Sequence, residues 1–196
     1  MAKQERSMSQ MDRDLNGSVV VVNDKILRGK REDTAGPLAA EILGGYRVRV
    51  FSRPASMNKP MHDGAPASDP EDGRLYHCAE KFDDVTATLN LAVSAGARVI
   101  VTVGGTGITL GDIAPEATAP LLEVRMDGIA QQIREHGLSV TPLASLSRGL
   151  VGITHRGPGG VLIVNAPGSR GGVKDSLDVV CPLLPHIFEQ LDDQMD

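Results

Sequence analysis

One short stretch of the chain combines glycines, a carboxylate and the start of a helix, which together can bind phosphate groups. Gly104-Gly-Thr-Gly107 follows the apolar, β-branched run 99–103, and Asp112 and Pro115-Glu116 come next. Glycines carry no Cβ, so backbone N–H groups at a helix start can approach an anion closely. A carboxylate beside bound phosphate is the type of ligand that holds Mg²⁺. The sequence therefore predicts a phosphate cradle at 104–107 with Asp112 as a metal ligand.

Two simpler interpretations of this stretch stay open. Glycine turns also occur in sheets that bind nothing, and a loop residue such as Asp112 is often a helix cap or a solvated side chain. Two nucleotide-binding motifs are excluded. Leu110 stands where the third glycine of a dinucleotide fingerprint belongs, and the chain holds no Gly-x-x-x-x-Gly-Lys-Ser/Thr motif. A phosphate cradle at 104–107 would therefore belong to neither of these two motif classes.

Two further polar stretches border apolar, strand-like runs. Ser147-Arg148 precedes the run 149–153, where it either begins a strand or offers a hydroxyl and a guanidinium to a phosphate. Residues 165–169, Asn-Ala-Pro-Gly-Ser, follow the run 160–164. The five histidines lack the spacing of metal ligands, so surface or capping roles are expected for them.

These stretches have to be positioned by alternating strands and helices. Continuous apolar runs predict strands, and one-sided apolar periodicity between a cap and a glycine predicts helices. The expected strands are 18–22, 48–51, 98–103 and 160–164, and the expected helices, with their caps, are 33–45, 82–96, 115–126, 128–136, 173–180 and 183–191. This order predicts an α/β protein, a three-layer α/β/α fold with a mostly parallel sheet. Polar loops at 23–32, 104–112 and 165–169 should then gather at the carboxyl ends of the strands.

The N-terminus and one internal stretch do not fit this alternation. Residues 1–17 are polar and charged, and we expect a disordered tail before a single domain at 18–196. Residues 53–73 hold four prolines and almost no periodicity, which predicts an irregular insertion. It is either a mobile surface segment or a lid over the site.

Composition narrows the class of protein. The 196 residues carry a formal net charge of −5, which disfavours a nucleic-acid surface. No run of 18 apolar residues is present, so no membrane span is expected. Two lone cysteines, Cys78 and Cys181, indicate a reducing compartment, the cytoplasm, rather than a disulfide framework.

The motifs occur together and in the order of one known family. The chain resembles the MoaB/Mog family of molybdenum-cofactor biosynthesis proteins, which includes the molybdopterin adenylyltransferases. The matching stretches are Asp24-Lys25 with Arg28-Gly29, 33–37, 102–107 with Asp112, 115–118, 146–148 and 165–169. They span residues 18 to about 190. The resemblance therefore implies a molybdopterin-binding, MoaB/Mog-like fold for the whole domain.

The resemblance implies a reaction and its substrates. Family enzymes transfer AMP from Mg-ATP to the terminal phosphate of molybdopterin and release pyrophosphate. Asp112 is thereby implied as a catalytic residue and Mg²⁺ ligand, where the ion would polarise the α-phosphate of ATP. The substrate-binding residues implied by the resemblance are Gly104, Gly105, Thr106, Gly107, Ser147, Arg148, Asn165, Pro167, Gly168 and Ser169. It further implies a homo-trimer or hexamer with molybdopterin and ATP as its partners, and the composition indicates neither nucleic acid nor membrane as a partner.

The chain departs from the family pattern at the second carboxylate. Active members usually carry an Asp after a Pro just before the helix that leads to the cradle strand, and the family spacing leads to Glu80, within 79–83. Glu80 is therefore the expected second catalytic carboxylate, with Asp83 as its alternative. Ala114 replaces a common Thr, and Asn23 a frequent Ser. A non-catalytic molybdopterin-binding carrier, or a scaffold, is the alternative function.

Overall fold

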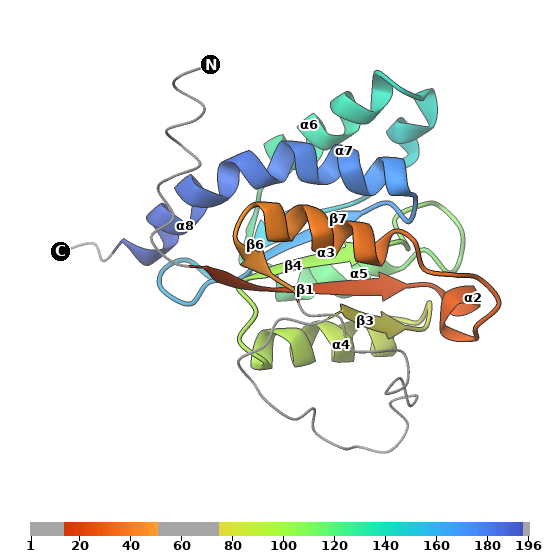
Figure 1. The fold of residues 1–196 in the computed structure, drawn as a ribbon, viewed down its shortest axis with the longest axis horizontal. Coiled ribbons are helices and arrows are strands. Elements are labelled where there is room, and N and C mark those ends of the chain that lie inside the picture. Colours follow the sequence, from red (N-terminus) through yellow and green to blue (C-terminus); the bar gives the residue numbers. More distant parts are fainter. Residues whose placement is uncertain (1–13, 51–74, 194–196) are drawn as a thin grey trace.

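The computed structural model describes residues 14–50 and 75–193, in which a central β-sheet lies between two layers of helices (Figure 1). The strand order is β2-β1-β4-β7-β6-β5, and β3 also pairs with β1. The strands are β1 (Leu15–Val22), β2 (Val48–Arg49), β3 (Leu75–Cys78), β4 (Val99–Val103), β5 (Val124–Arg125), β6 (Val151–Ile153) and β7 (Leu162–Ala166).

Parallel pairing dominates the centre of the sheet. β1 pairs in parallel with β2, β3 and β4, and β4 pairs in parallel with β7. Antiparallel pairing is limited, among the described strands, to β5 with β6 and β6 with β7. The expected α/β/α fold with a mostly parallel sheet is confirmed. The strands β1, β3, β4 and β7 all end at one side, here called the carboxyl edge, on the right in Figure 1.

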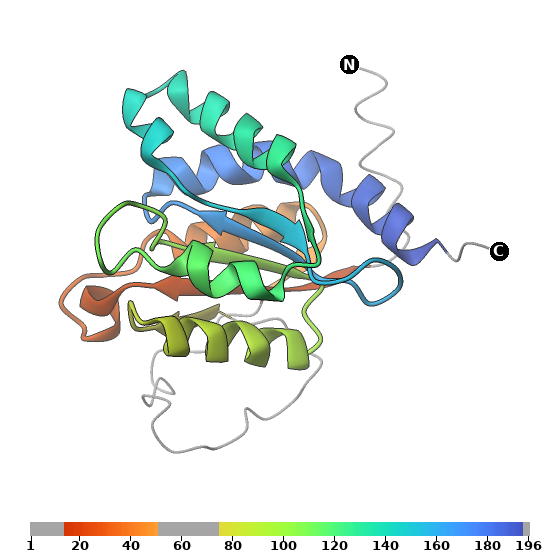
Figure 2. The same ribbon diagram turned by 180° about the vertical axis from the view of Figure 1, so that it is seen from behind.

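Two apolar clusters, one on each face of the sheet, hold the helices in place. α3 (Gly36–Gly45), α6 (Asp127–Leu138), α7 (Arg170–Val180) and α8 (Leu184–Asp192) cover one face, and α4 (Phe82–Ser94) and α5 (Ala114–Thr118) cover the other (Figures 1 and 2). The shorter turns are α2 (Asp24–Leu27) and the 3-10 helices η2 (Ala119–Leu121), η3 (Pro142–Leu146) and η4 (Cys181–Leu183). None of the helices in the described ranges has the length and apolarity to cross a bilayer.

β1 illustrates how the sequence produces a strand with two buried faces. Val19 and Val21 pack in the cluster that contains α3 and α7, and Val20 and Val22 pack in the cluster that contains α4. All four side chains are at most 2% exposed. Successive side chains of a strand point to opposite faces, so a strand covered on both sides is a continuous apolar run in sequence. Each buried valine stabilises the fold by about 1.5 kcal/mol relative to an exposed one.

The edge strand beside β1 is divided into two pieces. β2 faces the first two residues of β1 and β3 faces Val19–Val22, both in parallel and both on the side away from β4. At the register of β2, Val19 would face residue 52, but it faces Leu75 instead. The two pieces of this edge are therefore separate strands, β2 ending at Arg49 and β3 beginning at Leu75. The insertion expected at 53–73 lies outside the described residues.

The prediction of a helix at 115–126 is wrong beyond Thr118. α5 ends there, η2 follows, and Val124 and Arg125 then form β5 against β6. Pro120 explains the break, because proline has no N–H for the helical ladder and its ring clashes with the carbonyl four residues earlier. The expected helices at 33–45, 82–96 and 128–136 and the pair divided at Pro182 are all present.

The first strand begins earlier than expected. β1 starts at Leu15, which is 4% exposed and belongs to the core, so the tail expected at 1–17 is shorter than its stated range. The rest of that tail, residues 1–13, lies outside the described residues. The loop expected at 23–32 contains the single turn α2, whose first N–H groups are capped by the side chain of Asn23. β3 was not expected from the sequence.

The two cysteines are buried on opposite faces of the sheet, Cys78 on β3 and Cys181 at the start of η4. Burial raises the pKa of each thiol to about 12. Since the thiolate is the reactive form, we expect neither cysteine to react with iodoacetamide at pH 8 in the native protein. Both should be alkylated after unfolding in guanidinium chloride, as measured by intact mass. Rapid labelling of the native chain would contradict this expectation.

Candidate functional site

The polar loops gather at the carboxyl edge as expected. The Gly104 turn after β4 packs between the end of β1 and the loop after β7: a Cβ on Gly104 would lie 2.7 Å from the carbonyl oxygen of Val22, and a Cβ on Gly168 would lie 3.2 Å from the Cα of Gly104. The loop after β3 joins the same edge, because the N–H of Glu80 donates to Asp24 Oδ1 at 2.9 Å. Four loops that are distant in sequence therefore meet there.

The glycine turn has a backbone conformation that requires glycine. Gly104 has φ +101° and Gly105 has φ +66°, in the left-handed region that side chains with a Cβ rarely adopt. The N–H of Gly104 donates to Ala166 O at 3.0 Å, and Gly105 O accepts from Ala114 N at 3.0 Å. These bonds attach the turn to β7 on one side and to the first turn of α5 on the other.

Asp112 is held by its own loop. Its Oδ2 accepts two hydrogen bonds from Thr109, from the backbone N–H at 2.8 Å and from the hydroxyl at 2.6 Å. Partial burial alone would raise the pKa of Asp112, but the Thr109 bonds, a backbone bond from Gly107 and the charge of Arg148 together lower it. Asp112 is therefore an ionised carboxylate in a fixed position at neutral pH.

A second carboxylate lies next to this loop. A Cβ built on Gly111, the neighbour of Asp112, would lie 2.8 Å from Glu80 Oε2, so the Glu80 side chain rests directly on the loop. Asp83, the alternative, is exposed in the first turn of α4. Within residues 14–50 and 75–193 no three His, Cys, Asp or Glu side chains converge as metal ligands. A metal bound by Asp112 would therefore need phosphate oxygens and water to complete its coordination.

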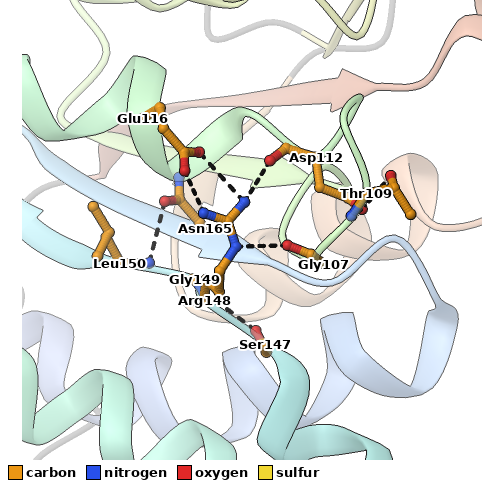
Figure 3. A network of polar contacts seen from close by, with 9 residues as sticks. All are labelled: Gly107, Thr109, Asp112, Glu116, Ser147, Arg148, Gly149, Leu150 and Asn165. Carbon is orange, nitrogen blue, oxygen red and sulfur yellow. Dashed lines mark hydrogen bonds and ion pairs between the residues drawn. The ribbon is translucent and has the colours of Figure 1, made fainter.

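Arg148 has a position that differs from the expected one. We expected its guanidinium to be available to a phosphate, but it is bound within the cradle loop (Figure 3). Nε donates to Gly107 O at 2.6 Å, Nη2 donates to Asp112 O, and the guanidinium forms an ion pair with Glu116. The hydrogen bond from Arg148 lowers the pKa of Glu116. Arg148 therefore connects the start of the loop, its end and the helix that follows.

Asn165 is also an internal residue, and the prediction that its side chain binds substrate is not supported by its position. It is 2% exposed. Its Nδ2 donates to the hydroxyls of Thr102 at 3.0 Å and Thr118 at 2.9 Å, and its Oδ1 accepts from Leu150 N at 3.1 Å (Figure 3). A polar residue inside an apolar strand was the signal for this role. Asn165 joins β4, α5 and the approach to β6 beneath the site.

Replacement of Asn165 by Ala should lower the free energy of unfolding by about 3 kcal/mol. The substitution removes the donor to the buried hydroxyls of Thr102 and Thr118 and the acceptor of the half-buried Leu150 N–H, and it opens a small cavity. Urea unfolding monitored by circular dichroism would measure the loss. Asn90→Ala, at an exposed position of α4, is the matched control and should cost less than about 0.5 kcal/mol. Equal effects of the two substitutions would argue against the Asn165 network.

The expected site residues outside the glycine turn and the Asn165 network lie at the surface of the carboxyl edge, whereas Thr106, within the turn, is buried. Ser147 and Pro167 are half-buried, and Gly168 and Ser169 are exposed. Ser169 caps α7 by accepting a hydrogen bond from Gly172 N at 3.1 Å. The N-terminus of α7, which carries partial positive charge, thus faces the same edge as the glycine turn.

Two contributions to the site were missed from sequence. Thr109, three residues before Asp112, positions its carboxylate, as short polar loop residues often do. An apolar rim was also missed: Ile108 is 70% exposed and Leu110 is fully exposed. With Ile113 they line a shallow surface hollow that Asp112, Glu116 and Arg148 also border.

Asp33, the first residue of the helical stretch expected at 33–45, lies two residues before the N-cap Ala35 and bonds with the backbone at the start of α3. Oδ1 of Asp33 accepts the N–H groups of Ala35 and Gly36 at the start of α3, at 3.1 and 2.8 Å. Its Oδ2 contacts Nε2 of His77 on β3 at 2.9 Å. Burial opposes ionisation of Asp33, but the bonds from His77 and Gly36 prevail and lower its pKa. This pair attaches β3, and so the loop with Glu80, to α3.

Comparisons with known proteins show the family of the chain. Residues 71–186 match the family described as "Probable molybdopterin binding domain". The chain is 30% identical to molybdenum cofactor biosynthesis protein B of Staphylococcus carnosus, over 97% of this chain and 99% of that protein. It is 36% identical to a molybdopterin adenylyltransferase of Helicobacter pylori, over 87% and 84% of the two chains. It is 41% identical to the Drosophila melanogaster protein cinnamon over 90% of this chain, but it spans only 26% of that protein and 21% of Dictyostelium gephyrin.

Solved structures give the same result. A molybdopterin biosynthesis protein from Mycobacterium abscessus superposes with a TM-score of 0.72 at 35% identity, covering 90% of this chain and 96% of that one. The tungsten cofactor synthesizing protein MoaB from Pyrococcus furiosus superposes with a TM-score of 0.74 at 25% identity, covering 93% and 100%. Fold and sequence therefore agree over nearly the whole described chain.

Proposed function

Since this chain belongs to the family of molybdopterin-binding proteins of molybdenum-cofactor biosynthesis, we propose that it is a molybdopterin adenylyltransferase. It would transfer AMP from Mg-ATP to the terminal phosphate of molybdopterin. The observation that supports this most is an ionised Asp112 at the end of a glycine cradle, with the Glu80 carboxylate resting on the same loop. Relatives named as adenylyltransferases are consistent with it.

The reaction needs positioning and charge neutralisation more than it needs a reactive side chain. An oxygen of the molybdopterin phosphate attacks the α-phosphorus of ATP, and the bond from that phosphorus to pyrophosphate breaks. The attacking phosphate is already ionised at neutral pH, so no general base is required. Catalysis then depends on holding two highly charged groups in line.

The residues at the carboxyl edge fit these needs. Asp112, with Glu80 beside its loop, offers the carboxylate oxygens that Mg²⁺ prefers. When bound there, Mg²⁺ would draw charge from the α-phosphate of ATP and make its phosphorus more electrophilic. Backbone N–H groups of the glycine turn, apart from that of Gly107, which bonds with Asp112, would hold phosphate oxygens. Ser147 and Ser169, with the N-terminus of α7, would hold the phosphate of molybdopterin.

A direct assay with Mg-ATP and molybdopterin tests the proposal. Wild-type protein should release pyrophosphate and form adenylylated molybdopterin, detected by mass spectrometry. Glu80→Gln should reduce the rate at least about tenfold, because it removes a negative charge beside the metal position. Asp83→Asn, on the exposed turn of α4, should leave the rate unchanged. The reverse pattern would make Asp83 the second carboxylate, and no pyrophosphate release by the wild type would contradict the proposal.

A second candidate is a protein that binds molybdopterin without transferring AMP. It is favoured by one observation, that residues 79–83, at the start of α4, hold no Pro-Asp pair, where active members usually carry the second carboxylate. Molybdopterin binding by fluorescence, without pyrophosphate release, would support this carrier function. Binding of neither pterin nor nucleotide would leave only a scaffold.

The resemblance also supports a cytoplasmic homo-oligomer, a trimer or a hexamer, built from one domain per chain. Sedimentation velocity tests this assembly independently of activity. A monomer at micromolar concentration would contradict it.

A further inference from the structure

Arg148 binds the cradle loop with both its backbone and its side chain. Its N–H donates to Thr106 O at 2.9 Å and its Nε donates to Gly107 O at 2.6 Å. Nη2 donates to the carbonyl oxygen of Asp112, and the guanidinium pairs with the carboxylate of Glu116 (Figure 3). All four acceptors belong to the single stretch 106–116, on which Asp112 stands.

These bonds fix the direction of the loop's N–H groups. A trans peptide unit is planar, so a carbonyl and the N–H of the next residue point in opposite directions. With the carbonyls of Thr106, Gly107 and Asp112 turned toward Arg148, the N–H groups of Gly107, Ile108 and Ile113 must point away from it. Gly107 also lies against the Asp112 carboxylate, because a Cβ built on Gly107 would lie 2.8 Å from Asp112 Oδ2. One guanidinium therefore orients both the donors and the carboxylate of the cradle.

The same bonds make Arg148 poorly suited to contact a phosphate itself. Its Nε, Nη1 and Nη2 atoms each donate to an acceptor of the loop, and the Glu116 carboxylate neutralises its charge. Its backbone is also held in place, because Leu150, two residues later, bonds with the buried Asn165. A side chain fixed in this way holds the residues that it contacts in position.

We propose that Arg148 is a positioning residue that sets the orientation of the phosphate cradle and of Asp112, and that it does not bind substrate directly. The expected effect of Arg148 on catalysis rests on the proposed function, adenylyl transfer. Its expected effect on the conformation of the loop does not. Lysine cannot replace it, because a single ammonium lacks the planar fork that reaches acceptors in several directions. Arg148→Lys therefore keeps the positive charge and removes the planar guanidinium that makes these bonds.

Hydrogen exchange of the ligand-free protein tests the positioning directly. In Arg148→Lys, backbone amides of 107–113 should exchange about tenfold faster than in the wild type, because charged hydrogen bonds that close the loop are lost. Amides of α3 and α8 should be unchanged. Arg156→Lys is the matched control, since Arg156 pairs with Glu123 at 2.8 Å on the surface, outside the cradle. Wild-type exchange of 107–113 in Arg148→Lys would overturn the proposal.

Kinetics then separate a positioning residue from a substrate ligand. Arg148→Lys should lower kcat about tenfold or more while KM for Mg-ATP and for molybdopterin changes less than about threefold. Glu116→Gln should act in the same direction, and the double variant should be little worse than Arg148→Lys, because both substitutions disturb one unit. A raised KM at unchanged kcat would overturn the proposal. If the wild type transfers no AMP, the proposed function fails and hydrogen exchange alone decides the role of Arg148.

Discussion

Asp112→Asn is expected to lower the rate of AMP transfer by about a thousandfold. The carboxylate is ionised and fixed by Thr109, and under the proposed function it is the ligand of the Mg²⁺ ion at the phosphate of ATP. Asparagine has nearly the same shape, and its amide oxygen can accept the Thr109 bonds, so the loop should keep its conformation. Pyrophosphate release at saturating Mg-ATP and molybdopterin measures the loss.

The control for this prediction is binding in the same variant. Molybdopterin affinity, measured by fluorescence titration, should change less than about threefold, because the pterin phosphate is expected near Ser147 and Ser169 rather than at Asp112. Asp127→Asn, at an exposed position in the first turn of α6, should be fully active. A variant at Asp112 with near wild-type turnover would show that the reaction does not depend on this carboxylate.

Gly104→Ala is expected to lower the free energy of unfolding by about 3 kcal/mol and the melting temperature by about 10 °C. Gly104 has φ +101°, which an alanine adopts only under strain, and the new Cβ would lie 2.7 Å from the carbonyl oxygen of Val22. That oxygen belongs to the backbone at the end of β1, so it can move away only if the strand ends separate. Differential scanning calorimetry measures the shift, and AMP transfer should be lost as well.

Gly29→Ala separates backbone strain from this collision. Gly29 also has a positive φ, +67°, but a Cβ there would meet nothing within 4 Å. Its substitution should therefore cost about 1 kcal/mol, the price of the left-handed conformation alone. A similar loss of stability in both variants would mean that the contact with Val22 is unimportant.

The fold could be predicted from sequence wherever burial follows a simple period. β1 and β4 are buried on both faces, so each is a continuous apolar run that predicts a central parallel strand. β3 was missed because it has only four residues, includes a histidine and follows a long, proline-rich stretch of sequence. The false extension of α5 shows that a proline inside an apparently helical stretch outweighs helical periodicity.

The candidate site was predictable in its loops but not in its contacts. Topology alone brings the ends of β1, β4 and β7 to one edge, so the gathering of their polar residues follows from the order of elements. Which polar residue contacts substrate depends instead on side-chain direction and competing partners. Arg148 and Asn165 both have side chains suited to ligand binding, yet their hydrogen bonds are made within the protein. Sequence contains no signal for such partners when they are 30 or more positions away.

The division of the edge strand between β2 and β3 has a consequence for the site. The position of Glu80 depends on the pairing of β3 with Val19–Val22 and on the contact of His77 with Asp33. The placement of the Glu80 loop is therefore inherited from the docking of a four-residue strand, and a change that loosens β3 loosens that loop with it.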